Sequence, residues 1–346
     1  MIIATLRDLQ WRARRFVIAG FGAAMVFALT LVLSGLGSSF STESRRVVDG
    51  VGADSWVVQK GVESVFATVS VVPVADASRI RGVDRADPVA LSHHSVHAHG
   101  MLVDVELLAY APGGLGTPHL VDGRLSRAPD EIVVDRSLGV KVGERFSLAS
   151  QQFQVVGRTD GQTINGGQPM LFARLPDVQK LLVGGAPVAS AIVTRGIPTS
   201  VPAGLAVRSK DQTRKDLLRP LVGAIASIKA MVGLLWIVAA MVIGSVVYLS
   251  ALERRRDFAV YKATGWSTRS LATGLALQAV LLSTTAALVG VVVAQLLLPL
   301  FPMNFTVPGS ARALLPVIGL AVGLIASAAG LRKAVGVEPA MAFGGP

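Results

Sequence analysis

Long uncharged stretches alternate along the chain with segments that carry its charge. No charged residue occurs in Phe16–Thr42, Ala230–Leu252 or Ser270–Ala311. A helix needs about 20 mostly apolar residues to cross a bilayer, so the third stretch is long enough for two crossings. Prolines interrupt it after Leu298, where they would end a helix. We therefore predict an α-helical membrane protein with four transmembrane helices and a mixed α/β extracytoplasmic domain inserted between helices 1 and 2.

The distribution of Lys and Arg predicts the orientation of these helices, because basic residues gather in short cytoplasmic segments. Basic residues precede the first stretch, follow the second, and follow the last at Arg332 and Lys333. We expect a multi-pass plasma-membrane protein with both termini in the cytoplasm and the large domain outside. The expected segments are a cytoplasmic amphipathic N-terminus (1–15), transmembrane helix 1 (16–42), the extracytoplasmic domain (43–218), a stalk with transmembrane helix 2 (219–252), a cytoplasmic loop or helix (253–269), transmembrane helix 3 (270–298), an outer loop (299–309), transmembrane helix 4 (310–331) and a cytoplasmic tail (332–346).

The inserted segment has the pattern of a mixed α/β domain. Short runs of β-branched and apolar residues are bounded by turn sequences such as Pro112-Gly113-Gly114, which is typical of strands. A short helix is expected after Pro176, over Asp177–Leu182. The expected strands are Ser55–Gln59, Asp104–Leu108, Glu131–Val134 and Phe153–Gly157.

Composition supports a membrane protein and argues against a nucleic-acid-binding one. The chain is 51% hydrophobic and only 16% charged, yet its formal net charge is +11, because 22 acidic residues stand against 33 basic ones. Its mean hydropathy is +0.57. The excess of basic residues lies mostly at helix ends, where it reports topology, so we expect no nucleic-acid partner. The absence of cysteine excludes disulfides, thiolate metal sites and cysteine nucleophiles.

Histidines gather in the segment SHHSVHAHG of the inserted domain. A strand would place His97 and His99 on one face, whereas a helix would bring His93 and His97 one turn apart. Imidazoles at these spacings can bind zinc, copper or haem iron. A solvated histidine-rich loop explains the same residues, and no Asp, Glu or Cys joins the cluster. We predict no metal site and keep His93, His94, His97 and His99 as the candidate ligands.

The segment ERRRDFAVYKATGWSTRS, residues 253–270, presents apolar side chains between charges on the expected cytoplasmic side. The arginines alone are explained as topology determinants. An apolar run bounded by charge and closed by Gly265 instead suggests a short helix that docks into a partner.

This segment, extended to Leu271, resembles the signature of the FtsX/MacB-like ABC transporter permeases, in which an "LRALGA"-like run occupies the place of Tyr261–Gly265. Asp257 stands where the family usually has Glu, Ala259 where it has Gly, and Lys262 where it has Arg. The ending LRKAVGVEPAMAF is similar to the family's "DPAxAL" ending. The stretch VVDRSLGVKVGERFSL, followed by FQVVG, resembles a passage of the family's outer domain.

The resemblance implies a membrane subunit of an ABC-type exporter or mechanotransmitter that exports a hydrophobic or amphiphilic compound. The chain has no GxxxxGK[ST] loop, so we expect no enzyme activity and no cofactor in this chain, with ATP and Mg bound by a separate cytoplasmic ATPase subunit. Four spans are few for a transporter, so we also expect a second copy of the chain as partner. The expected ATPase-coupling residues are Arg256, Asp257, Phe258, Val260, Tyr261, Lys262 and Gly265, and no catalytic residue is expected.

Two other functions remain open. One is a non-transporting regulator of an extracytoplasmic protein, such as a cell-wall hydrolase. The other is an amino-acid importer permease, which usually has more spans and no large outer domain.

Membrane lipid is an expected partner, since Lys229 and Arg219 lie near the outer end of span two and can snorkel or contact anionic lipid. Gln278 and Gln295 are expected to form hydrogen bonds between helices. Small residues at helical spacing predict close helix packing at Gly319, Gly323 and Ser327.

Overall fold

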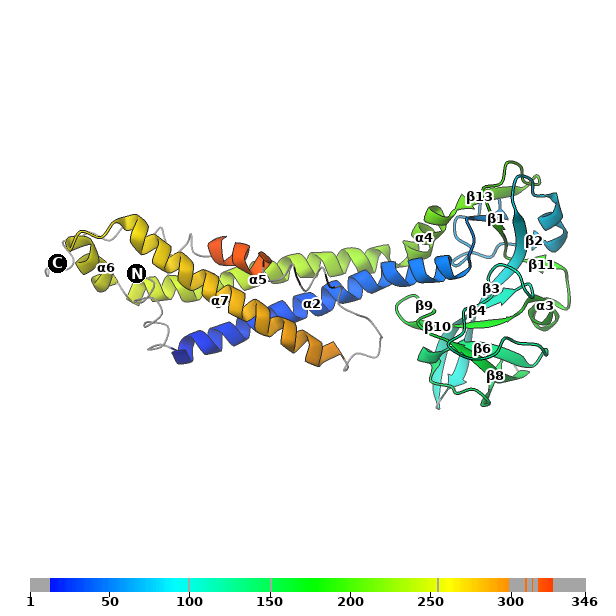
Figure 1. Ribbon diagram of the computed structural model, residues 1–346, viewed down its shortest axis with the longest axis horizontal. Coiled ribbons are helices and arrows are strands. Elements are labelled where there is room, and N and C mark those ends of the chain that lie inside the picture. Colours follow the sequence, from blue (N-terminus) through cyan, green and yellow to red (C-terminus); the bar gives the residue numbers. More distant parts are fainter. Residues whose placement is uncertain are drawn as a thin grey trace. The chain divides into compact units, whose positions relative to one another are not determined.

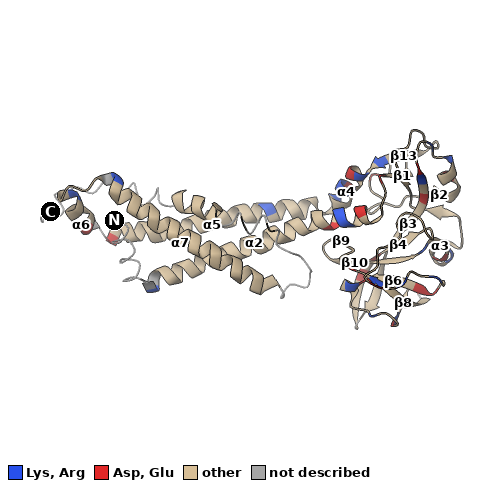
Figure 2. Ribbon diagram, viewed as in Figure 1, with Lys and Arg blue, Asp and Glu red and all other residues tan. Residues whose placement is uncertain are grey.

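The computed structural model describes residues 13–98, 100–149, 151–253, 255–298, 309, 313 and 317–325. Its contacts divide the chain into two compact units. We call residues 1–38 with 224–346 the membrane unit and residues 39–223 the inserted domain. Most elements of both are labelled in Figure 1. Figure 2 shows that charged residues crowd the inserted domain and are sparse along the long helices, as the hydropathy pattern predicts.

Three long helices carry the apolar stretches of the chain. They are α2 (Ala13–Gly50), α5 (Val222–Glu253) and α7 (Thr268–Leu297). Within the described residues, three helical segments are long and apolar enough to cross a membrane. The expected fourth helix, 310–331, is described only at Ala313 and 317–325, which are helical, and the rest of it lies outside the described residues. The structure therefore supports three of the four predicted spans.

Helix α2 continues past Thr42, where the uncharged stretch ends, to Gly50. Charge ends an apolar span but not a helix, because Glu, Ser, Arg and Val all tolerate helical backbone. The last turns of α2 belong to the inserted domain. The chain thus enters the inserted domain within helix α2. It leaves that domain through α4 (Lys210–Leu218), the 3₁₀ turn η3 (Arg219–Leu221) and α5.

Small residues allow α2 and α7 to pack closely in the membrane unit. A Cβ on Gly290 of α7 would lie 2.9 Å from the Ala24 carbonyl oxygen and 2.9 Å from the Phe27 Cβ. Phe27 also contacts Trp236 of α5, with ring centroids 5.7 Å apart. Gln278 of α7 donates from Nε2 to the Ser250 hydroxyl of α5 at 3.1 Å, which confirms the predicted interhelical hydrogen bond for this residue. Gln295 of the same helix is exposed.

A mixed sheet forms the inserted domain, with strands in the order β13-β1-β12-β3-β4-β10-β6-β8-β5. In addition β7 pairs with β8, β9 pairs with β10, and β11 and β2 form a small separate sheet. The pairs β10–β4 and β6–β8 are parallel and the others are antiparallel. The bounds are β1 Ser55–Gln59, β2 Val72–Pro73, β3 Arg85–Ala98, β4 Met101–Tyr110, β5 Asp122–Gly123, β6 Glu131–Asp135, β7 Arg145–Leu148, β8 Gln151–Thr159, β9 Thr163–Ile164, β10 Gln168–Arg174, β11 Val188–Ala189, β12 Ala191–Arg195 and β13 Leu205–Ser209, with α3 at Leu175–Val183 and 3₁₀ turns η1 at Val74–Arg79 and η2 at Arg136–Leu138.

Both faces of the central strands are buried. On β4, Leu108 and Tyr110 belong to one apolar cluster, with Trp56 and Met170. Leu107 points to the opposite face, into a second cluster, because successive side chains of a strand alternate. The four predicted strands are all confirmed: Ser55–Gln59 matches β1, and the other three lie within β4, β6 and β8. The predicted helix over Asp177–Leu182 lies within α3.

Candidate functional site

Helix α6 (Arg255–Ala263) is amphipathic and lies between α5 and α7 in the chain. Phe258 and Ala259 are buried, and Phe258 packs in the core of the membrane unit. Arg256 and Asp257 are exposed, and Val260 is 50% exposed. A helix of nine residues is not stable on its own, so the buried Phe258 positions α6 and leaves its other face accessible.

A Schellman motif ends α6 at the glycine that the sequence singled out. Gly265 has a φ of +91°, a conformation that glycine adopts without steric cost. The Gly265 amide donates to the Lys262 carbonyl at 3.1 Å, and the Trp266 amide donates to the Tyr261 carbonyl at 2.9 Å, which is the paired bonding of this motif. The Tyr261 and Trp266 rings lie 5.4 Å apart. The cap fixes where the chain turns from α6 into α7.

The structure thus brings the seven predicted coupling residues onto one short helix and its cap. Phe258 faces the core of the membrane unit. Tyr261 and Lys262 are partly exposed, and the exposed positions continue to Trp266. Trp266 is not among the predicted coupling residues, although an aromatic residue directly after a helix-ending glycine is a signal that could have identified it.

A second group of polar contacts holds the end of α2 within the inserted domain. Glu43 accepts a hydrogen bond from the Thr163 hydroxyl at 2.9 Å and another from the Gly166 amide at 3.0 Å. Asp49 pairs with Lys210 at 2.9 Å and with Arg214 of α4. We call these contacts the junction. They connect the last turns of α2 to α4 and to the β9–β10 hairpin.

Apolar packing reinforces the junction. Val47 and Val48 of α2 and Leu217 of α4 are buried in the same core as Trp56. No role for Glu43 or Asp49 follows from the sequence. The partners lie more than a hundred residues away in the chain, so spacing alone could not reveal them. A displacement of the end of α2 would act directly on these contacts.

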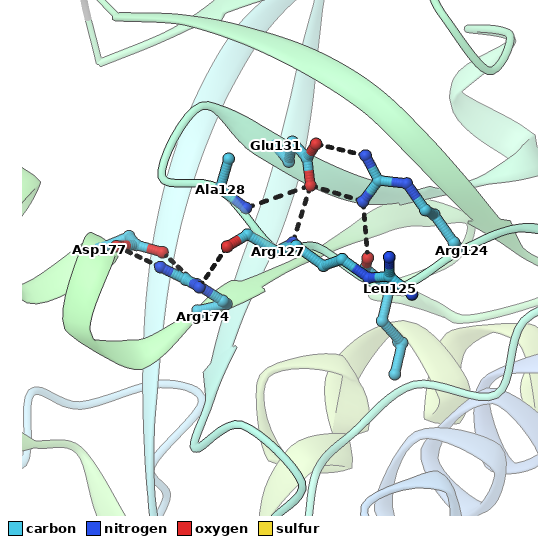
Figure 3. A network of polar contacts seen from close by, with 7 residues as sticks. All are labelled: Arg124, Leu125, Arg127, Ala128, Glu131, Arg174 and Asp177. Atoms are coloured by element: carbon cyan, nitrogen blue, oxygen red, sulfur yellow. Dashed lines mark hydrogen bonds and ion pairs between the residues drawn. The ribbon is translucent and has the colours of Figure 1, made fainter.

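A network of charged side chains fixes the loop between β5 and β6 and the start of α3 (Figure 3). Arg124 makes two hydrogen bonds to the Glu131 carboxylate, which also accepts from the backbone amides of Arg127 at 2.7 Å and Ala128 at 3.2 Å. These donors, of which Arg124 has the largest effect, hold the pKa of Glu131 at about 2. Arg174 pairs with Asp177 at 2.6 Å and donates to the Arg127 carbonyl. Every carboxylate here is satisfied by the chain itself, so the network is structural.

The histidine segment forms part of strand β3, so of the two alternatives that the sequence left open the structure has the strand and not the helix. His93 and His97 share one face of the strand, and His94 points to the other. The pKa of His94 is lowered mainly by burial and to a smaller extent by the charge of His93. The candidate His99 lies outside the described residues. Within the ranges that the structure describes, no group of three His, Cys, Asp or Glu side chains could hold a metal ion.

The predicted packing residues lie against α7 of the same chain. A Cβ on Gly319 would lie 3.1 Å from the Ala287 Cβ. A Cβ on Gly323 would lie 3.0 Å from the Ala279 carbonyl oxygen. These two glycines therefore serve packing within one chain. Ser327 lies outside the described residues.

Comparison with known proteins gives consistent matches along the chain. A family model described as FtsX-like permease C-terminal matches residues 229–339. An uncharacterized ABC transporter permease of Mycobacterium tuberculosis (strain ATCC 25618 / H37Rv) is 42% identical over 349 residues, covering 100% of both chains. A Staphylococcus epidermidis protein that carries the name hemin transport system permease protein HrtB is 21% identical over 364 residues, covering 98% of both. The periplasmic region of MacB from Actinobacillus actinomycetemcomitans aligns with a TM-score of 0.35 at 13% identity, over 49% of this chain and 94% of that one.

The match to the mycobacterial permease extends over the full length of both proteins, and the FtsX-like model covers the α5–α7 region that contains α6. The resemblance inferred from the motif around Gly265 is therefore confirmed. This chain belongs to the FtsX-like family of ABC transporter permeases, which are the membrane subunits of these transporters and not their ATPases.

Proposed function

We propose that this protein is the permease of an ABC exporter that converts ATP hydrolysis by a separate cytoplasmic subunit into motion of the inserted domain. The ATPase binds the exposed face of α6, and α2 and α5 carry the motion to the junction. The cargo is a hydrophobic or amphiphilic compound. A relative named as a hemin transport system permease supports an amphiphilic cargo.

The observation that carries this proposal is the geometry of α6. A short helix with one face anchored by Phe258 and a rigid glycine cap presents Arg256, Asp257 and the half-exposed Val260 to a partner. An exposed valine flanked by charged residues suits docking into a groove of a partner. Because Phe258 connects α6 to the membrane core, a push on α6 reaches the long helices.

The proposal includes the orientation and the assembly. Both termini and α6 lie in the cytoplasm, and the inserted domain lies outside the plasma membrane, in keeping with the basic residues around 253–269. Two copies assemble, because the few spans of one chain do not enclose a transport path. The ATPase subunit holds ATP and Mg, and this chain holds no cofactor. Lys229 and Arg219 contact lipid headgroups.

The test is reconstitution of the chain with its ATPase in proteoliposomes, followed by ATP hydrolysis and release of a trapped amphiphilic dye. Val260→Asp places a charge on the proposed docking face and should lower permease-stimulated ATP hydrolysis at least about tenfold, the loss expected for one buried interface contact. Val142→Asp is the matched control, since Val142 is 42% exposed in the inserted domain. Equal ATPase stimulation by the two variants would contradict the docking role of α6.

The transport step has its own outcome in the same assay. ATP-dependent movement of the dye supports export. ATP hydrolysis that depends on Val260 without movement of any compound would support the alternative, a regulator that acts on an extracytoplasmic protein such as a cell-wall hydrolase.

A further inference from the structure

The inserted domain contains a cavity at the edge of its main sheet. Strand β12 pairs with β3 only up to Val89, so beyond this residue the edge of β3 has no strand partner within the described part of the chain. Residues 65–71, α3 and the segment 188–190 surround the space beside it, which has a volume of about 420 Å³. Cavities of this size hold small organic molecules.

Apolar side chains form most of the wall and the rim of this edge cavity. Val65 and Val178 are buried beside it. At the rim, Val69 is 84% exposed, Val71 50% and Val183 46%. Scattered exposed apolar residues need no explanation, but a contiguous group around a cavity marks a binding surface.

Several polar side chains of the wall are occupied by the chain itself. The Ser190 hydroxyl bonds to the backbone of Leu91, and the Gln179 amide donates to the Val188 carbonyl at 2.7 Å. The Ser70 hydroxyl accepts from the Gln59 amide at 3.2 Å. Glu106 of β4 differs from them, because it is an ionisable group that is only 4% exposed and lines the cavity.

The Glu106 carboxylate has little stabilisation from its surroundings. Among the described residues its recorded partner is His93, opposite it on β3, with 3.5 Å between Glu106 Oε2 and His93 Nδ1. The same Nδ1 lies 3.0 Å from the Gln168 side-chain nitrogen. When that amide donates to Nδ1, neutral His93 has no proton left there for Glu106. The Glu131 carboxylate, by contrast, is stabilised by four hydrogen bonds that it accepts.

We propose that the edge cavity binds a small apolar molecule that carries a protonated amine, with the Glu106 carboxylate as the partner of the amine. The charge of the occupant follows from the charge of the group that lines the wall, because a buried carboxylate requires a cation or hydrogen-bond donors. The shape and polarity follow from the apolar wall. The site lies wholly in the inserted domain, so its occupation goes beyond the proposed export and does not depend on it.

The test uses the full chain in phosphatidylcholine nanodiscs at pH 8, with empty nanodiscs as the baseline. The probes are 1-naphthylmethylamine, 1-naphthylmethanol and 1-naphthoate, which share one ring and differ in charge. Equilibrium dialysis measures their binding. The amine should bind at least about tenfold more tightly than the alcohol, as expected for a charged hydrogen bond, and the carboxylate should bind most weakly.

Three variants locate the binding. Glu106→Gln should abolish the preference for the amine and leave alcohol binding intact, which also shows that the cavity is still formed. Ala67→Trp, at an exposed position of the wall, should weaken all three probes by filling the cavity. Glu131→Gln should behave as the wild type. Equal binding of amine and alcohol, an amine preference that survives Glu106→Gln, binding unaffected by Ala67→Trp, or no binding above empty nanodiscs would each overturn the proposal.

Discussion

Glu106 makes the stability of the inserted domain depend on pH. Burial raises the pKa of Glu106 from 4.5 to about 7. Between these values the folded domain keeps a proton that the unfolded chain has lost, so the free energy of unfolding decreases as pH rises. The contribution is fully present below about pH 4.5 and is lost as the pH passes about 7. At about 1.36 kcal/mol per pKa unit, the loss amounts to about 3 kcal/mol.

Glu106→Gln removes this ionisation while keeping the size of the side chain. Relative to the wild type, the variant should become more stable by about 3 kcal/mol between pH 4.5 and pH 8. Hydrogen–deuterium exchange of the β4 amides in the full chain, corrected for the intrinsic effect of pH on exchange, measures the free energy of opening of the inserted domain. Taking the difference between variant and wild type removes the contribution of all other titrating groups.

Glu131→Gln provides the control, because hydrogen bonds from Arg124 hold the pKa of Glu131 at about 2. In the folded domain Glu131 stays ionised from pH 4.5 to pH 8, and in the unfolded chain it is partly protonated only at the lower end of this range. Its replacement should therefore change the opening free energy by nearly the same amount at both pH values. A difference between Glu106→Gln and wild type that does not change with pH would refute the reasoning, since it would mean that Glu106 ionises in the folded domain as easily as in the unfolded chain.

Three further predictions concern helix packing, the junction and the cap. Gly290→Ala should destabilise the membrane unit by about 1–3 kcal/mol through overpacking against α2. The control Gly233→Ala, with nothing within 4 Å of the added Cβ, should be neutral or stabilising. Thermal unfolding followed by tryptophan fluorescence measures both variants, and equal shifts in the unfolding temperature would contradict the packing. Asp49→Ala and Arg214→Ala should be less than additive in a double-mutant cycle, with a coupling of about 0.2–1 kcal/mol for this partly exposed pair; full additivity would remove the ion pair from the junction. Gly265→Ala should cost about 1–2 kcal/mol for a positive φ and lower permease-stimulated ATP hydrolysis, so unchanged hydrolysis would separate the cap from coupling.

Local patterns predicted the elements whose structure is set locally. The run of β-branched and apolar residues in Ser55–Gln59 indicated β1. Gly265 indicated the end of α6, because the left-handed backbone there favours glycine. The histidine segment was ambiguous, since SHHSVHAH has no apolar period. Its strand conformation comes from pairing with β4 along His93–Ala98, a contact that β4 supplies from the next part of the chain.

Non-local pairings were not predictable from one sequence. The parallel pair β10–β4 joins Met170 to Glu106, and nothing in either strand specifies the other. The same holds for the junction, where Asp49 meets Arg214 of α4. The edge cavity also needs the tertiary fold, because its wall comes from five separate segments. Glu106 was visible in a predicted strand, but its burial depends on all of them.

The stability and the binding proposed for Glu106 must report the same ionisation. An amine binds the carboxylate form, so its apparent affinity scales with the ionised fraction, and at two units below a pKa of about 7 the affinity should fall about a hundredfold. Among the residues that line the cavity, His93 is the other titrating group, and a proton on it would repel the amine in the same direction. The alcohol probe carries no charge and should show neither effect. Stability that titrates near pH 7 together with amine binding that does not would therefore mean that the amine pairs with another group. Agreement of the two midpoints would assign both to one buried carboxyl.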